Sequence, residues 1–208
     1  MILLIKRFTV QSTLLIACLS LFSIDASAMT SPDDVVKNTV NSMVENLRTN
    51  RVSYENDNQA LYKMLDETLL PVLHVKRMAD LILGKKIAKK ASQAQKDEFV
   101  TEFKALLLQT YASGLLSATG EEKVVYEPID LAPGADKVKV KAMLITASGE
   151  EFPITLFMSN RRDTSWRAYN LDVAGIDFIR TYRSTFKQTL KETGIDGLIA
   201  DLRSKNAL

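Results

Sequence analysis

Residues 137–147 read KVKVKAMLITA, and this alternation decides the fold class. Three lysines alternate here with apolar residues, which are Val138, Val140, Ala142 and Leu144. Successive side chains of a strand point to opposite faces of its sheet. The segment therefore predicts a strand with one apolar face and one hydrated face, in a sheet that other elements cover on one side only.

Neighbouring segments extend this sheet and add helices. Strand-like composition recurs at 123–129, 151–159 and 165–173, and the short links between the strands predict antiparallel pairing. Capping residues and apolar periodicity predict helices at 31–47, 59–70, 92–115, 176–191 and 196–204. A further helix, after Pro71, is predicted to end at Gly84. Helices, then strands, then helices predict an α+β fold, with helices packed on one face of a twisted four-stranded antiparallel sheet.

The first 28 residues have the pattern of a secretory signal peptide. Two basic residues precede an apolar stretch over 8–24, and ASA at 26–28 is a small-residue cleavage site. A competing pattern is LIAC at 15–18, which resembles a lipoprotein box in which Cys18 is acylated. The complete ASA site favours cleavage after Ala28, leaving one domain over 29–208.

Composition excludes several classes of protein. The 208 residues are 46% hydrophobic and 25% charged, which is typical of a globular chain and not of a disordered, collagen-like or polytopic membrane protein. The net charge of +2 gives no global support for nucleic-acid binding. One cysteine and one histidine exclude a disulfide scaffold and a metal site built on paired histidines. An enzyme using His74 as general base stays open as a lesser hypothesis.

Basic residues gather near one predicted helix end, at Lys76-Arg77, Lys85-Lys86 and Lys89-Lys90. Two interpretations are open. The cations complement a helix C-terminus on a hydrated face, or they form a docking patch for anionic head groups or an acidic partner.

The segments 103–116 and 152–158 carry more apolar side chains than one face of a helix or strand needs. Such a surplus fits an ordinary core, and it equally fits an apolar cavity between helices and sheet. Periodicity alone leaves both possibilities open.

Four stretches together resemble one family: LLPVLHVK (69–76), LILG (81–84), SWRAYNLDVAGIDFIRTYRSTF (165–186) and GIDGLIADLRSK (194–205). In order and spacing they are similar to the MlaC or toluene-tolerance (Ttg2D-like) family of periplasmic phospholipid-binding proteins. The chain departs from the family at Asn170, Ala174 and Asp177, where Asp, Glu and Ser are common. These departures put a shared polar role of that turn in doubt.

The resemblance implies a periplasmic phospholipid carrier of the Mla pathway rather than an enzyme, with phospholipid as cargo and no cofactor, metal or catalytic residue. It implies an apolar cavity between helices and sheet, and two partners: an inner-membrane ABC transporter complex and an outer-membrane lipoprotein–porin complex. A periplasmic chaperone or adaptor is the alternative. We expect the cavity lining to include Val75, Met78, Ala79, Ile82, Phe99, Phe103, Leu106, Leu107, Tyr111, Val140, Ala142, Leu144, Ile154, Leu156, Met158, Trp166, Ala168 and Ile179.

Overall fold

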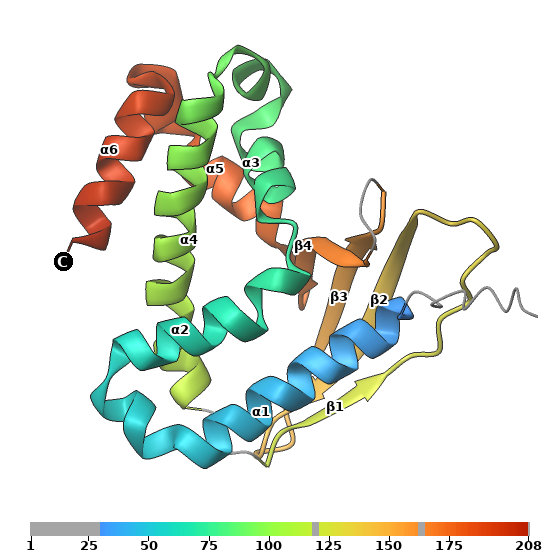
Figure 1. The fold of residues 1–208 in the computed structure, drawn as a ribbon. Helices are drawn as coiled ribbons and strands as arrows, with labels where there is room; N and C mark the ends of the chain where they lie inside the picture. Colours follow the sequence, from blue (N-terminus) through green and yellow to red (C-terminus); the bar gives the residue numbers. More distant parts are fainter. Residues whose placement is uncertain (1–29, 118–120, 162–164, 208) are drawn as a thin grey trace, which may run out of the picture.

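The computed structural model describes residues 30–117, 121–161 and 165–207, which form an α+β fold with a five-stranded antiparallel sheet (Figure 1). The expected fold class is confirmed, while the predicted signal segment and Cys18 lie outside the described residues. The helices are α1 (Pro32–Asn56), α2 (Asn58–Thr68), the 3₁₀ turn η1 (Leu70–Val72), α3 (Val75–Lys90), α4 (Gln93–Leu116), α5 (Phe178–Glu192) and α6 (Gly194–Asn206). The strands, in both sequence and sheet order, are β1 (Lys123–Tyr126), β2 (Lys137–Ile145), β3 (Glu151–Ser159), β4 (Arg167–Val173) and β5 (Ile176–Asp177).

The register of β2 against β3 confirms the two-faced strand. The pairs run from Lys137 opposite Ser159 to Ile145 opposite Glu151. The three lysines of β2 are exposed, whereas Val140 and Ala142 are buried. Cross-strand partners share a face, so the apolar residues of β2 continue across β3 as one apolar face.

The turn before α5 differs from the expected one. Residues 176 and 177, expected to begin the helix, form the short edge strand β5 instead. Ala174 and Gly175 have positive φ angles of 51° and 83°, so the chain reverses tightly between β4 and β5. Asp177 then caps α5 by accepting a hydrogen bond from the Arg180 amide. Polar residues at this turn therefore have a structural role.

Asn170 completes that turn. Its side-chain amide nitrogen donates to the Asp177 carboxylate at 2.7 Å, and its amide oxygen accepts from the Ile179 backbone at 3.2 Å. Asn170 and Asp177, two of the departures from the family pattern, therefore form one hydrogen-bonded unit with each other.

Three predicted helix boundaries can be compared with the structure. Ser92 and Gln95 make the reciprocal capping-box bonds at the start of α4, as expected. Gly84 leaves the helical conformation with a φ of 75°, but helix resumes and α3 ends only at Lys90, so the expected helix end was wrong. Likewise α1 continues past the expected end at 47 to Asn56, because Tyr54 in its last turns is buried.

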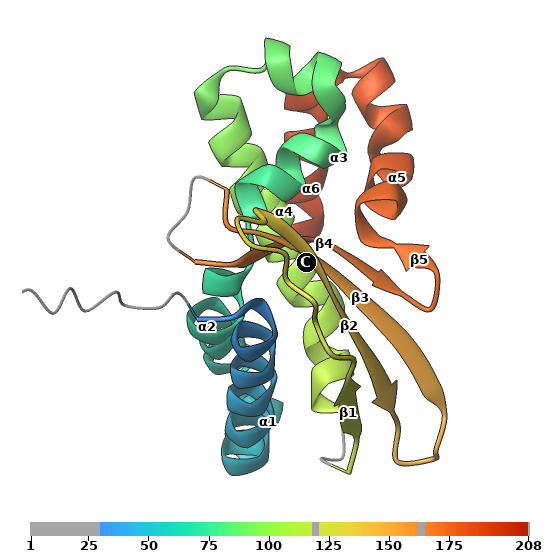
Figure 2. The same ribbon diagram turned by 90° about the vertical axis from the view of Figure 1, so that its right-hand side faces the viewer.

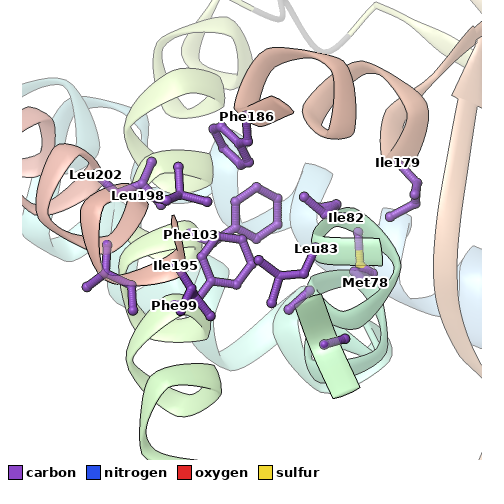
Figure 3. Packing of buried hydrophobic residues seen from close by; sticks show 13 residues of the cluster. Met78, Ile82, Leu83, Phe99, Phe103, Ile179, Phe186, Ile195, Leu198 and Leu202 are labelled. Carbon is purple, nitrogen blue, oxygen red and sulfur yellow. The ribbon is translucent and has the colours of Figure 1, made fainter. Parts of the chain in front are cut away.

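Three clusters of buried apolar residues hold the fold together. The helical cluster joins α3, α4, α5 and α6, with Phe99 and Phe103 stacked at its centre and Phe186 edge-on to both (Figure 3). The sheet cluster packs Val36 of α1 against β2, β3 and β4. The α1–α2–α4 cluster contains Tyr54, Leu61, Met64, Leu65 and Ala112. Each cluster buries enough apolar surface to contribute several kcal/mol, at roughly 25 cal/mol per Å².

Candidate functional site

The three clusters are arranged as a ring. Helix α4 contributes to the helical cluster and to the α1–α2–α4 cluster, and α1 contributes to the latter and to the sheet cluster. Leu73, just after η1, packs against both the helical and the sheet clusters and closes the ring. None of the three contains both an α4 residue and a strand residue. Figures 1 and 2 show the sheet along one side of the molecule, with α4 across from it.

The apolar face of the sheet continues beyond the sheet cluster. Register places Leu144 beside Phe152, Leu156 beside Leu171, and Ile154 beside Val173. We call five of these residues the inner lining: Leu144, Phe152, Ile154, Leu171 and Val173. They share the face of the buried Val140 and Met158, yet they belong to none of the three clusters.

Exposure rises along this face. Val140 is fully buried and Ala142 is 7% exposed, whereas Phe152 is 36% exposed at the start of β3. Ile176, which pairs with Val173 at the sheet edge, is 66% exposed. On α4, Tyr111 is 49% exposed. Large apolar side chains left this exposed beside a buried apolar face are candidates for a binding surface.

Two tyrosine side chains form a polar contact between helices α4 and α5. The Tyr182 hydroxyl donates to the Tyr111 hydroxyl at 3.3 Å, joining α5 to α4. The Tyr182 ring packs against Phe103 and Phe178, with ring centres 5.1 and 4.8 Å away. Burial, reinforced by the Tyr111 hydrogen bond, raises the pKa of Tyr182. The Tyr182 hydroxyl therefore stays protonated and can donate a hydrogen bond.

A third hydroxyl lies in the sheet. The Tyr126 hydroxyl is buried and has no hydrogen-bond partner among the described residues. Burial also raises the pKa of Tyr126, and the Lys37 ammonium over its ring opposes this shift. A buried hydroxyl without a partner costs stability.

The structure divides the 18 predicted lining residues by their surroundings. Ten are buried within the helical or the sheet cluster, where they pack against other apolar side chains: Met78, Ala79, Ile82, Phe99, Phe103, Ile179, Val140, Met158, Trp166 and Ala168. Three are partly buried against a cluster: Leu106, Leu107 and Leu156. Five lie outside the clusters: Val75, Tyr111, Ala142, Leu144 and Ile154.

Sequence reasoning missed Leu171 and Val173. Counting alternate residues from Ala168 puts Asn170 and Asp172 on the apolar face. A register shift between Phe157 and Met158 changes the alternation, so that Leu171 pairs with Leu156. Asn170 and Asp172 could have indicated this change of face, because two polar side chains at alternate positions do not fit an apolar face.

The acidic residues and His74 are the groups to consider for metal binding. In the described ranges, no three His, Cys, Asp or Glu side chains are placed to hold a metal ion. His74 lies half-buried at the start of α3, where its backbone N–H donates to the Ala168 carbonyl at 2.8 Å. Nor does any described helix combine the length and apolar character needed to span a membrane.

Comparison with known proteins decides the family. The model of the MlaC protein family matches residues 37–204, which include all three clusters except Val35 and Val36. The chain belongs to the MlaC family. This membership confirms the resemblance seen in the four sequence stretches.

One relative and one solved structure extend the comparison for this MlaC-family chain. The toluene tolerance protein ttg2D of Pseudomonas putida is 25% identical over 182 residues, covering 88% of this chain and 83% of that protein. A solved structure of a phospholipid-binding protein from Ralstonia solanacearum, in complex with a phospholipid, superposes with a TM-score of 0.77 at 22% identity. The superposition covers 85% of this chain and 97% of the other, so the two share a fold.

Proposed function

We propose that this chain is a periplasmic phospholipid carrier that holds acyl chains against the inner lining and catalyses no reaction. The observation that supports it is the open end of the apolar sheet face, where Leu144, Ile154 and Val173 remain half-buried outside the three clusters. Family membership adds weight, as does the phospholipid bound to the protein of the same fold. The cargo is then the only ligand, and no cofactor is required.

The energetics favour a carrier over free diffusion. Moving two acyl chains of about thirty methylenes from membrane to water costs on the order of 20 kcal/mol, at about 0.8 kcal/mol per methylene. An apolar lining offsets most of this cost and keeps transfer reversible. Weak selection among head groups follows, because apolar contacts supply most of the binding free energy.

The polar head is expected to stay at the rim of the lining. We expect the head to meet the Tyr111 and Tyr182 hydroxyls, which join α4 to α5, because Tyr111 is half-exposed. Hydroxyl groups can donate hydrogen bonds to the ester and phosphate oxygens of any glycerophospholipid. On this proposal the acyl chains lie against the sheet and the glycerol backbone lies toward solvent.

The transport route is the second part of the proposal. An exported carrier shuttles phospholipid between an outer-membrane lipoprotein–porin complex and an inner-membrane ABC transporter complex, which maintains the lipid asymmetry of the outer membrane. The predicted signal peptide over 1–28 and the family membership support this route.

Mass spectrometry of the purified, exported chain tests the proposal. We expect a native mass that exceeds the 29–208 polypeptide by one phospholipid, and loss of that excess on denaturation. The same protein, stripped of lipid, should extract phospholipid from vesicles. Protein that carries no lipid and extracts none would contradict the carrier function, and stoichiometric binding of unfolded proteins instead would support a chaperone. A diacylglyceryl adduct on Cys18 would exclude a freely diffusing shuttle.

A further inference from the structure

A second surface feature lies away from the inner lining. Helices α3 and α5 flank a groove of about 740 Å³. Its lining residues are Ile82, Leu83, Lys86, Ile87, Lys90, Arg180, Arg183, Ser184, Lys187, Leu190 and Lys191. The α5 residues recur every three to four positions, so they form one face of that helix. The opposite face of α5 carries Tyr182 and Phe186, which pack in the helical cluster.

The groove is strongly cationic. Six of its eleven lining residues are lysine or arginine, and none is acidic. Within the described part of the chain, none of the six takes part in a salt bridge. Nearby lysines behave differently, since Lys76 pairs with Asp97 and Lys96 with Asp80. Like charges facing each other across a groove repel, so an anionic occupant would be stabilised there.

The groove also has apolar lining residues, and its two helices approach each other closely at one point. Leu83, Ile87 and Leu190 lie among the cations. At the α3 kink, a Cβ atom on Gly84 would lie 2.5 Å from Arg183 Nη2, and the φ of 75° also favours glycine. Glycine therefore allows the α5 guanidinium to approach the backbone of α3 closely.

We propose that this groove docks an acidic segment of a partner protein, with apolar side chains of that segment inserted between the two cationic walls. Charge complementarity selects the acidic character, and the apolar lining residues select side chains that reach into the groove. A planar membrane surface fits less well, because the lining has no Trp, Tyr or Phe to anchor in an interface. Since the groove and the inner lining occupy different surfaces, docking does not require the cargo to leave.

Labelled peptides test the proposal by fluorescence anisotropy with the purified full chain. The first probe is an 18-residue helical peptide with glutamates on one face and leucines on the other. The second replaces every leucine by serine, and vesicles of phosphatidylglycerol and phosphatidylcholine form a third probe. The groove variant is Arg183→Glu with Lys187→Glu. The matched control is Lys137→Glu with Lys139→Glu on the outer sheet face, which changes the net charge equally.

We expect the leucine-containing peptide to bind the unaltered chain, and its Kd to rise about tenfold or more in the groove variant but not in the control. The serine peptide should bind at least about tenfold more weakly than the leucine peptide. Equal weakening by both variants, or equal binding of both peptides, would overturn the proposal. Binding to phosphatidylglycerol vesicles that the groove variant alone abolishes would assign the groove to a membrane instead.

Folding and cargo are checked on the same samples. The substituted side chains are exposed, so both variants should keep the thermal unfolding midpoint of the unaltered chain. Native mass spectra should show the same lipid load in both variants. If the unaltered chain carries no lipid, the carrier function is contradicted. The docking site is still tested separately, by the peptide binding.

Discussion

Replacing Ile154 by lysine puts an ammonium group on the inner lining. Ile154 lies between Ala142 and Val173 on the apolar sheet face, and it belongs to none of the three clusters. The half-buried side chain leaves the lysine a path to water while the lining is empty. We therefore expect a loss of folding stability of no more than about 1–2 kcal/mol.

With lipid bound, the same ammonium group would be enclosed by acyl chains. The effective penalty for burying an unpaired ion in a protein is several kcal/mol. Even if the lysine stem bends outward and recovers part of that penalty, a net loss of about 3 kcal/mol remains, which weakens lipid binding by roughly 150-fold. A fluorescent phospholipid extracted from vesicles gives this affinity directly, and native mass spectra give the retained cargo.

The neighbouring residue provides a matched control. Thr155 lies on the same strand but faces outward, opposite Lys141 on β2 and Asp172 on β4. Thr155→Lys adds the same charge at nearly the same position without touching the lining, so its lipid affinity should stay within about twofold of the unaltered chain. If Ile154→Lys carries as much lipid as Thr155→Lys, the inner sheet face is not the cargo site.

Three further substitutions test individual structural assignments by thermal unfolding. Tyr126→Phe removes a buried hydroxyl without a partner and should raise stability by about 1 kcal/mol; a loss of cargo instead would show that this hydroxyl contacts lipid. Ala174→Gly relieves a positive φ of 51° and should add about 0.5–1 kcal/mol, whereas a lower melting temperature would contradict the tight β4–β5 turn. The Arg77 guanidinium lies 3.8 Å from the Tyr169 ring centre and donates to the buried Ser159 hydroxyl. Arg77→Ala should therefore lower the free energy of unfolding by about 1–2 kcal/mol. An unchanged stability would show that this bridge between α3 and the sheet is dispensable.

The alternating pattern of β2 was sufficient to predict the sheet and its faces. Residues 137–142 alternate between lysine and apolar residues, and the structure exposes the three lysines while it buries Val140 and Ala142. Strand β4 was harder, because its face switches at a register shift that depends on pairing with β3. A bulge is a property of two strands, whereas alternation is read from one. Leu171 and Val173 were missed for that reason.

The basic residues near α3 likewise show that sequence alone does not reveal which charged side chains share a surface. Lys76-Arg77 and Lys85-Lys86 look alike in sequence, yet Arg77 is half-buried against Tyr169 while Lys86 lines the open groove. The cations of α5 that complete the groove lie about a hundred residues later. Only the packing of α3 on α5 brings the two sets together, so the sequence indicates a basic segment but not its partner wall.

The ring of clusters explains how the chain can remain folded while its lining is empty. The buried residues of α4 pack against other helices, and those of β2 and β3 pack against Val36 of α1 and Ala168 of β4, so no cluster packs α4 directly against a strand. Substitutions in the clusters, such as Phe103→Ala, should then lower stability by about 3–5 kcal/mol, while substitutions in the lining should change cargo affinity with little effect on stability. This separation is what a reversible carrier needs, since lipid must leave without the protein unfolding. A lining residue whose loss destabilised the empty chain as much as Phe103→Ala would argue that the two walls are in fact joined by packing.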